Sequence, residues 1–294
     1  MNTYLYAIVV GLTAASLVHA DSEQVPDPKS SPGYQYEQSR ILEAQPVGPY
    51  NQPEWTTARR FPNTRVYLQQ QPWGFGVEQW VKAQWPRGEA ANYLFQEEME
   101  IGLPYRTQID LYENWRIDDR GKVFQDSTAA EIRWALADWG KIWGNPTLYG
   151  EWKFAAQNQG ADAYELKLLL GDEITPRLHW GFNGIYEQET GGGRATEIGG
   201  SFALSYTVID EKFSAGMELK IESETEKGAR DNAPLEIDLG PSIQWRPTKA
   251  THVDVAPLIG LTSDSPHVEL WVVFGWNFGP GNEAAHAPVS LQSY

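Results

Sequence analysis

The 294-residue chain contains no cysteine, which excludes disulfides, thiolate metal sites, c-type haem attachment and a lipidated N-terminal cysteine. Histidine is scarce, with five in the whole chain. The G-x-S-x-G, H-E-x-x-H, phosphate-loop and dinucleotide-binding signatures are all missing from the sequence. We therefore expect no cofactor, no metal site and no enzymatic activity.

Positive charge is also in short supply. The chain has 23 Lys and Arg against 39 Asp and Glu, which gives a formal net charge of -16 and a pI of about 4.7. A surface of this charge repels phosphate, so nucleic acid is not an expected partner.

Long apolar runs are confined to the N-terminus, and the mean hydropathy is -0.48. Residues 5–15 are apolar, and Val18 and Ala20 precede the polar Asp21. This pattern predicts a secretory signal peptide over residues 1–20, although the first six residues include no lysine or arginine. A membrane anchor is the alternative, but the run is shorter than the roughly 20 residues that a spanning helix needs.

The sequence does contain a sustained two-residue period. In residues 267–278, HVELWVVFGWNF, the apolar side chains of Val268, Phe274 and Trp276 share one parity, while Glu269 and Asn277 share the other. Successive side chains of a strand point to opposite faces, so this segment predicts a strand with one apolar and one mixed face. The same period recurs in about twelve segments between residues 73 and 278, many near the length that a tilted strand needs to cross a bilayer.

The connections between these segments alternate in length. Those after the second, fourth, sixth, eighth and tenth segments are tight, whereas long polar links follow the third (DDRGKVFQDS), seventh (QETGGGRAT) and ninth (ETEKGARDNAP). Short turns on one side and long loops on the other are typical of outer-membrane barrels. The predicted fold class is all-β: an antiparallel transmembrane β-barrel of about 12 strands over residues 73–278, preceded by a Pro-rich leader.

Alternation alone also fits a secreted β-sandwich, which hides one face of each strand in a core. Two observations favour lipid instead. The mixed face carries charge along the middle of the segments, and aromatic side chains recur near the ends of the apolar face, as in the interfacial girdles of a membrane barrel. Glycines on the mixed face, such as Gly181, are expected where a closing sheet bends. We predict an outer-membrane protein, with outer-membrane lipid and the assembly machinery as partners.

Residues 21–72 hold eight prolines and little alternation. They predict an extended leader, with one short strand at residues 64–69. A disordered tether is the favoured interpretation, and a segment that folds into or across a barrel mouth is the alternative. Residues 279–294 form a C-terminal tail, which either lies back in the periplasm or leaves Phe278 as an internal aromatic signal for assembly.

The strand rhythm, the segment QPWGFGVEQW (residues 71–80) and the hairpin GLPYR (residues 102–106) resemble the outer-membrane barrels grouped with the MetA-pathway phenol-degradation proteins, a transporter-like family. The resemblance covers residues 73–278 and carries over no catalytic or binding residue. It implies passage or binding of small molecules, aromatic ones among them.

Charged residues of the mixed face are the candidate lumen lining and the candidate selectivity determinants: Glu98, Glu100, Arg106, Asp110, Arg133, Glu151, Lys153, Glu218, Lys220, Glu236 and Asp238. Acids outnumber bases, which predicts a channel for neutral or cationic small-molecule permeants. Ion-pair ladders between strands are the commoner explanation of such charges, and the two are compatible. A closed structural or surface-display barrel is the alternative function, because twelve strands leave a narrower bore than the 16–18 of porins.

An outer-membrane hydrolase is the remaining alternative. His179 faces the polar side, and Ser201 and Glu197 share its parity on the following segment. Antiparallel pairing places His179 opposite about residue 203, so that it cannot easily reach both Ser201 and Glu197. We therefore expect His179→Ala to leave esterase and phospholipase activity unchanged, because there is none to lose.

Overall fold

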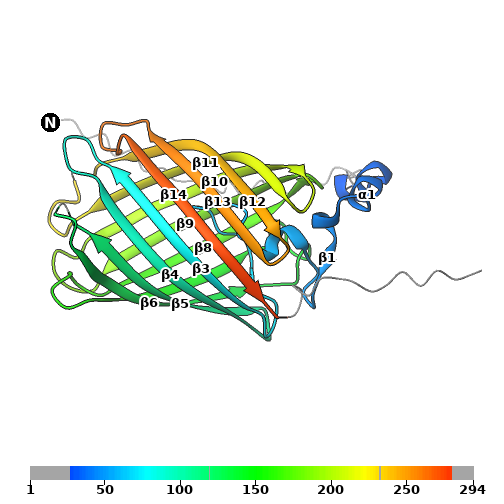
Figure 1. The fold of residues 1–294 in the computed structure, drawn as a ribbon, viewed down its shortest axis with the longest axis horizontal. Helices are drawn as coiled ribbons and strands as arrows, with labels where there is room; N and C mark the ends of the chain where they lie inside the picture. The colour runs from blue at the N-terminus through cyan, green and yellow to red at the C-terminus, as the bar shows by residue number, and fades with distance from the viewer. Residues whose placement is uncertain (1–26, 119, 232, 280–294) are drawn as a thin grey trace, which may run out of the picture.

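The computed structural model describes residues 27–118, 120–231 and 233–279, which form a closed barrel of twelve antiparallel strands and a short N-terminal segment (Figure 1). The predicted signal peptide and the tail beyond residue 279 lie outside the described residues. Within the described ranges, no helix has the length and apolar character needed to cross a membrane. The predicted fold class is confirmed.

The barrel strands follow one another around the cylinder in chain order. Their bounds are β3 Phe75–Trp85, β4 Asn92–Leu103, β5 Thr107–Ile117, β6 Val123–Ala135, β7 Thr147–Ala155, β8 Ala163–Thr175, β9 Leu178–Glu189, β10 Thr196–Ile209, β11 Phe213–Thr225, β12 Glu236–Thr248, β13 Thr251–Gly260 and β14 Val268–Phe278. β14 pairs with β3 along its whole length, which closes the sheet and leaves no edge strand with unpaired backbone groups.

Short elements precede the barrel: η1 (Pro28–Ser30), α1 (Pro32–Gln38), η2 (Leu42–Ala44), β1 (Pro46–Val47), β2 (Gln52–Pro53) and η3 (Glu54–Thr57). α1 lies outside one end of the barrel (Figure 1). The Tyr34 hydroxyl donates a hydrogen bond of 2.7 Å to Glu173 of β8, and Lys29 pairs with Asp172. Burial and the charge of Glu173 raise the pKa of Tyr34, so its hydroxyl stays protonated and keeps this tie to the rim.

The alternation predicted for β14 is present in the structure. Glu269 and Val273 point inward and are fully buried, whereas Phe274 and Trp276 are 46% and 47% exposed on the outside. Large apolar side chains are exposed in the same way on the other strands: Val77, Leu111, Ile132, Leu148, Leu166, Phe202, Met217, Ile243 and Ile259. A closed barrel with an apolar exterior and a polar interior is the form that a sheet takes in a bilayer, so the apolar face of β14 contacts lipid.

Aromatic side chains gather toward both ends of the outer face. At one end, Trp85 packs edge-on against Tyr93, with ring centroids 6.4 Å apart. At the other end, Phe75 and Phe278 meet across the seam between β3 and β14 at 5.9 Å. Amphipathic and aromatic rings at two levels mark the two lipid–water interfaces of a membrane barrel.

Residues 50–72 (the plug) lie inside the barrel, at the end where α1 sits. Trp55, Phe61 and Leu68 are at most 1% exposed. The interpretation of this part of the leader as a disordered tether is therefore wrong, and the folded alternative applies. The strand predicted at residues 64–69 is also wrong, because the segment has no ladder partner among the described residues and Tyr67 has a left-handed φ of 52°.

Two glycines of the wall make room for the plug. A Cβ on Gly171 of β8 would lie 2.5 Å from Val66, and one on Gly181 of β9 would lie 2.8 Å from the same side chain. These distances are shorter than carbon–carbon contact allows. Gly181 therefore lets the plug approach the wall closely. Its place on the mixed face had predicted only a bend of the sheet.

The connections follow the predicted asymmetry, with two corrections. At the plug end, residues 176–177 alone join β8 to β9, and residues 249–250 join β12 to β13. The link over residues 136–146 is long although it lies at this end, because its Trp139 packs edge-on against Trp55 of the plug, with centroids 5.7 Å apart. The predicted long third link shrinks to residues 118–122, because β6 already begins at Val123.

Candidate functional site

Arginines of the plug bind acids of the inner wall. Arg65 Nη2 lies 3.0 Å from Glu98 Oε1, and Arg59 Nη2 lies 2.8 Å from Glu78 Oε2. Burial alone would lower the pKa of Arg65, but the negative charges of Glu98 and Glu131 outweigh burial and raise this pKa well above its ordinary value. Arg65 is therefore a permanent cation inside the lumen.

Neutral groups complete the contact between plug and wall. Thr64 Oγ1 donates to Ser201 Oγ at 2.9 Å, and the backbone N–H of Arg65 donates to Asn183 Oδ1 at 2.8 Å. The backbone N–H groups of Gln69 and Gln70 both donate to Gln108 Oε1. The plug backbone, which has few partners of its own, thus obtains hydrogen bonds from strands on opposite sides of the barrel.

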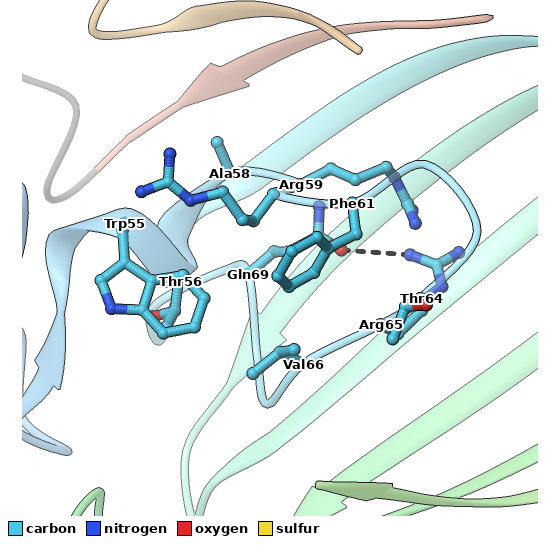
Figure 2. Close-up of a pocket in the computed structure, with 10 residues that line it drawn as sticks. Trp55, Thr56, Ala58, Arg59, Phe61, Thr64, Arg65, Val66 and Gln69 are labelled. Atoms are coloured by element: carbon cyan, nitrogen blue, oxygen red, sulfur yellow. Dashed lines mark hydrogen bonds between the residues drawn. The ribbon is translucent and has the colours of Figure 1, made fainter. Parts of the chain in front are cut away.

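The plug leaves almost no free space at its level. Figure 2 shows its chain doubling back between Ala58 and Gln69, with the hydrogen bond of 3.1 Å from Arg65 Nη1 to Gln69 Oε1 inside the fold. A gap beside Trp55 and Phe61 measures about 10 Å³, which is close to the minimum of ~10–15 Å³ that one water molecule needs. This gap is therefore too small for an organic solute.

Beyond the plug the lumen widens into a cavity of about 520 Å³. Arg59, Asn63 and Arg65 of the plug form its floor. Its walls are mostly polar and reach Glu224 and Glu236, next to the long loops at the end opposite the plug (the open end). The barrel therefore holds a polar vestibule that reaches the open end and has the plug as its floor.

A continuous row of acidic residues climbs the inner wall. Each is the direct cross-strand partner of the next, from β4 to β11: Glu100, Asp110, Glu131, Glu151, Glu165, Glu187, Glu197 and Glu224. Because barrel strands tilt by ~35–45°, a row that crosses them rises along the barrel axis, here from the plug to the open end. Like charges directly opposite each other are destabilising, so the row needs cations beside it.

These cations are unevenly distributed. Within the cavity, Lys153 Nζ lies 3.1 Å from Glu187 Oε2, and Lys167 pairs with Glu165 at 2.7 Å. Further up the row, no lysine or arginine nitrogen of the described residues lies within 4.0 Å of the carboxylate of Glu197 or Glu224. The carboxylates at the open end of the row therefore lack a neighbouring cation.

Arg133 holds the plug end of the row together. Its side chain is fully buried and contacts the carboxylates of Asp110 and Glu131. Its Nη1 also donates to Gln69 Oε1 of the plug at 3.1 Å. One wall cation thus joins two neighbouring members of the row to the plug.

The predicted lumen residues fall into separate places in the structure. Five lie at the level of the plug: Glu98, Glu100, Asp110, Arg133 and Glu218. Four line the cavity: Glu151, Lys153, Lys220 and Glu236. Asp238 is buried in the wall, 4.0 Å from Lys220 Nζ. Their role in selectivity stays a prediction.

Arg106 is wrongly placed by the prediction. It lies in the turn between β4 and β5, with a left-handed φ of 60°, and its Nη1 is 3.2 Å from Asp138 at the rim. The alternation of the sequence continues through this turn, so a prediction based on alternation starts β5 one residue too early. Arg106 therefore stabilises the plug-end rim and does not line the lumen.

Other inward residues were left out of the prediction. Glu269 of β14 binds two lysines, with Lys220 Nζ and Lys82 Nζ 3.2 and 3.3 Å from its Oε2. Glu269 and Lys82 have the parity of the mixed face, so the pattern used for their neighbours identifies them as well. The plug residues Arg59 and Arg65 carry no such signal, because the plug has no period.

His179 has a plug partner instead of a nucleophile. It pairs with Ser205, two residues beyond the predicted position, and its Nδ1 lies 3.0 Å from Arg60 Nη2. Ser201 pairs with Asn183 and receives the hydrogen bond of Thr64. Among the described residues, the hydrogen-bond partners of His179 are Arg60 and the carbonyl of Pro176, so no hydrolase site forms around it.

Buried carboxylates also approach one another closely enough to surround a metal ion. The ligand oxygens of Glu98, Asp110 and Glu131 lie within 4.8 Å of one another, as do those of Glu78, Glu98 and Glu100. The guanidinium of Arg65 stands beside both groups.

Solved structures with a similar fold are outer-membrane channels. An outer-membrane channel from Pseudomonas putida F1 matches with a TM-score of 0.50 and 11% identity, over 74% of this chain and 98% of that chain. The NanC porin and the KdgM porin in complex with disordered oligogalacturonate each match with a TM-score of 0.48, at 12% and 8% identity, over 70% and 69% of this chain and 99% of theirs. No family model and no curated protein matches the chain.

The chain has the fold of an outer-membrane β-barrel. With the lipid-facing exterior of the strands, this fold confirms the predicted outer-membrane localisation. The similarity to outer-membrane channels is confirmed at the level of fold, and the finer resemblance to the phenol-degradation proteins stays a prediction.

Proposed function

We propose that the protein is an outer-membrane channel for small neutral or cationic solutes, whose lumen is gated by the plug. The observation that carries this proposal is the acidic row, which leads from the open end to the plug along a cavity of about 520 Å³. Carboxylates that line a passage attract cations and repel anions. A cavity of this volume matches a small organic molecule.

Aromatic side chains in the cavity support the aromatic permeants that the family resemblance implies. Trp80 and Trp271 line it, with ring centroids 5.9 Å apart. Lys82 Nζ lies 4.8 Å from the centre of the Trp271 ring. Flat apolar surfaces beside charged groups suit a planar solute that carries a polar substituent.

The closed structural barrel is the rival function, and the filled plug end favours it as a resting state. The two functions differ in whether the plug moves. The plug is held by buried ion pairs and hydrogen bonds, and water can solvate these polar groups once the plug and the wall separate. This kind of contact favours a plug that can move. We include the absence of enzymatic activity in the proposal, because His179 is engaged by the plug.

A disulfide lock tests the gate. The hydroxyl oxygens of Thr64 and Ser201 lie 2.9 Å apart, and the chain has no native cysteine to interfere. Thr64→Cys with Ser201→Cys should therefore join plug and wall under oxidation. In planar bilayers we expect the reduced double variant to show cation-preferring conductance steps, and the oxidised one to lose them.

Each single cysteine variant is the control, since neither can form the lock. Conductance that is identical in the oxidised and reduced double variant would show that solutes bypass a fixed plug. Silence of the wild type and of every variant, in barrels that show heat-modifiable migration, would favour the structural barrel.

A further inference from the structure

We propose that Glu98, Asp110 and Glu131 form a binding site for a divalent metal ion, and that Arg65 of the plug occupies this site while the channel is closed. The three carboxylates come from the neighbouring strands β4, β5 and β6, and each is at most 3% exposed. Their ligand oxygens lie within 4.8 Å of one another. The effect of the metal ion on channel opening rests on the proposed function, whereas binding of the metal ion does not.

Arg65 stands where a bound cation would stand. Its Nη2 lies 3.0 Å from Glu98 Oε1 and 3.8 Å from Glu131 Oε2. It belongs to the plug, which has no strand pairing with the wall, whereas the three carboxylates belong to the barrel. The barrel therefore keeps the acidic site when the plug moves, and the plug takes the cation away.

An unsatisfied oxygen marks the site as incomplete with Arg65 alone. Glu131 Oε2 has no hydrogen-bond partner among the described residues, although Glu131 is only 2% exposed and this oxygen lies 3.8 Å from Arg65 Nη2. A buried acceptor without a donor is unfavourable, and a metal ion in the site would satisfy it.

The charge of the site fits a divalent ion once the plug has moved. Arg59 and Arg65 of the plug both approach Glu98 in the closed state. Without them the three carboxylates and the wall residue Arg133 sum to a charge of about -2, which a divalent ion neutralises. All donors are oxygens, which Ca²⁺ and Mg²⁺ prefer. The Tyr112 hydroxyl, 3.1 Å from Arg65 Nη2, offers a further oxygen.

Removal of Arg65 exposes the site for measurement. We expect full-length Arg65→Ala, in detergent, to bind one Ca²⁺ at least about tenfold more tightly than the wild type by isothermal titration calorimetry, because a competing positive charge is gone. Adding Glu131→Gln to this variant should abolish the gain. Arg60→Ala is the matched control, since Arg60 is a plug arginine that contacts Glu43 and not the site.

Equal Ca²⁺ affinity of Arg65→Ala and Arg60→Ala, or a gain that survives Glu131→Gln, would overturn the proposal. If Arg65→Ala does not fold, the proposal is tested on the wild-type protein by its response to Ca²⁺. Its open probability in bilayers should rise when CaCl₂ replaces KCl at equal ionic strength, and Glu131→Gln should remove this response. A response that Glu131→Gln leaves intact would contradict the site. Ca²⁺ binding in barrels that never conduct would instead reject the gate and keep the site.

Discussion

The indole of Trp55 stacks on the imidazole of His179, with ring centroids 4.4 Å apart and an angle of 14° between the planes. Trp55 also donates from Nε1 to Glu173 at 3.0 Å, and the second oxygen of this carboxylate accepts from Tyr34. The plug, the wall and the external leader thus meet at one point. The position of His179 in the sequence suggested catalysis as an alternative, and its surroundings make it a support for the plug.

The first prediction concerns this stack. We expect His179→Ala to leave esterase and phospholipase activity at the background level of the wild type, because none of the described serines or threonines is hydrogen-bonded to His179. The same variant should increase the open probability in bilayers, since it removes the surface on which Trp55 rests. Lipid hydrolysis by the purified barrel that disappears in both His179→Ala and Ser201→Ala would contradict the channel in favour of a hydrolase.

A second prediction concerns ion selectivity at the open end. Glu197 has no cation within 4.0 Å among the described residues, so Glu197→Gln removes an unpaired negative charge, and we expect the ratio of cation to anion permeability at alkaline pH to fall by roughly twofold. A unit charge about 8 Å away in a water-like medium is worth roughly 0.5 kcal/mol, which sets this size. Reversal potentials in a KCl gradient measure the ratio. Glu97→Gln, on the outer face of β4, is the control and should leave it unchanged.

A third prediction concerns the stability of the buried network. Arg133→Met keeps an unbranched apolar stem but leaves Asp110 and Glu131 without their shared cation. Breaking a buried ion pair in this way destabilises by about 3–5 kcal/mol. We expect a matching decrease in the free energy of unfolding, measured by guanidinium titration in micelles. Arg116→Met, which breaks an exposed pair with Asp126, should change it by less than about 1 kcal/mol, and an equal loss in both variants would contradict this interpretation.

A fourth prediction uses two neighbours on β4. Glu97 is exposed on the outer face and lies directly opposite Glu113 of β5, whereas Glu98 points inward to Arg65. An acid on the lipid face is unfavourable by roughly 1 kcal/mol, somewhat less than a basic residue. Glu97→Leu should therefore stabilise the protein in urea titrations in lipid vesicles, and Glu98→Leu should destabilise it. The same sign of change for both would show that the two faces are misassigned.

The barrel was predictable because its signal is local. The two-residue period of β14 assigns Phe274 and Trp276 to lipid and Glu269 to the lumen without knowledge of any other strand, since the pleat alone separates the faces. Even there the limit of each strand was less certain, as Arg106 shows. A turn residue with left-handed φ keeps the parity of the strand before it and leaves no mark in the pattern.

The plug was not predictable in the same way. Its apolar residues Trp55, Phe61 and Leu68 are separated by irregular intervals, and its backbone obtains hydrogen bonds from side chains far away in sequence, such as Asn183. Prolines and arginines in such a segment resemble a linker when read alone. Only the acidic interior of the barrel, formed by strands that come later in the chain, makes Arg59 and Arg65 recognisable as its partners.

Asn277 connects the plug to the seam of the barrel, and this has a consequence for biogenesis. Its Nδ2 donates to the carbonyl of Thr57 at 3.0 Å, its Oδ1 accepts from Gln70 at 2.8 Å, and it pairs with Gly76 across the seam. The N-terminal plug leaves the ribosome first and β14 last. Because one side chain contacts the plug and belongs to the seam, closure of β14 on β3 and seating of the plug stabilise each other. We therefore expect the barrel to close during biogenesis with the plug already in place.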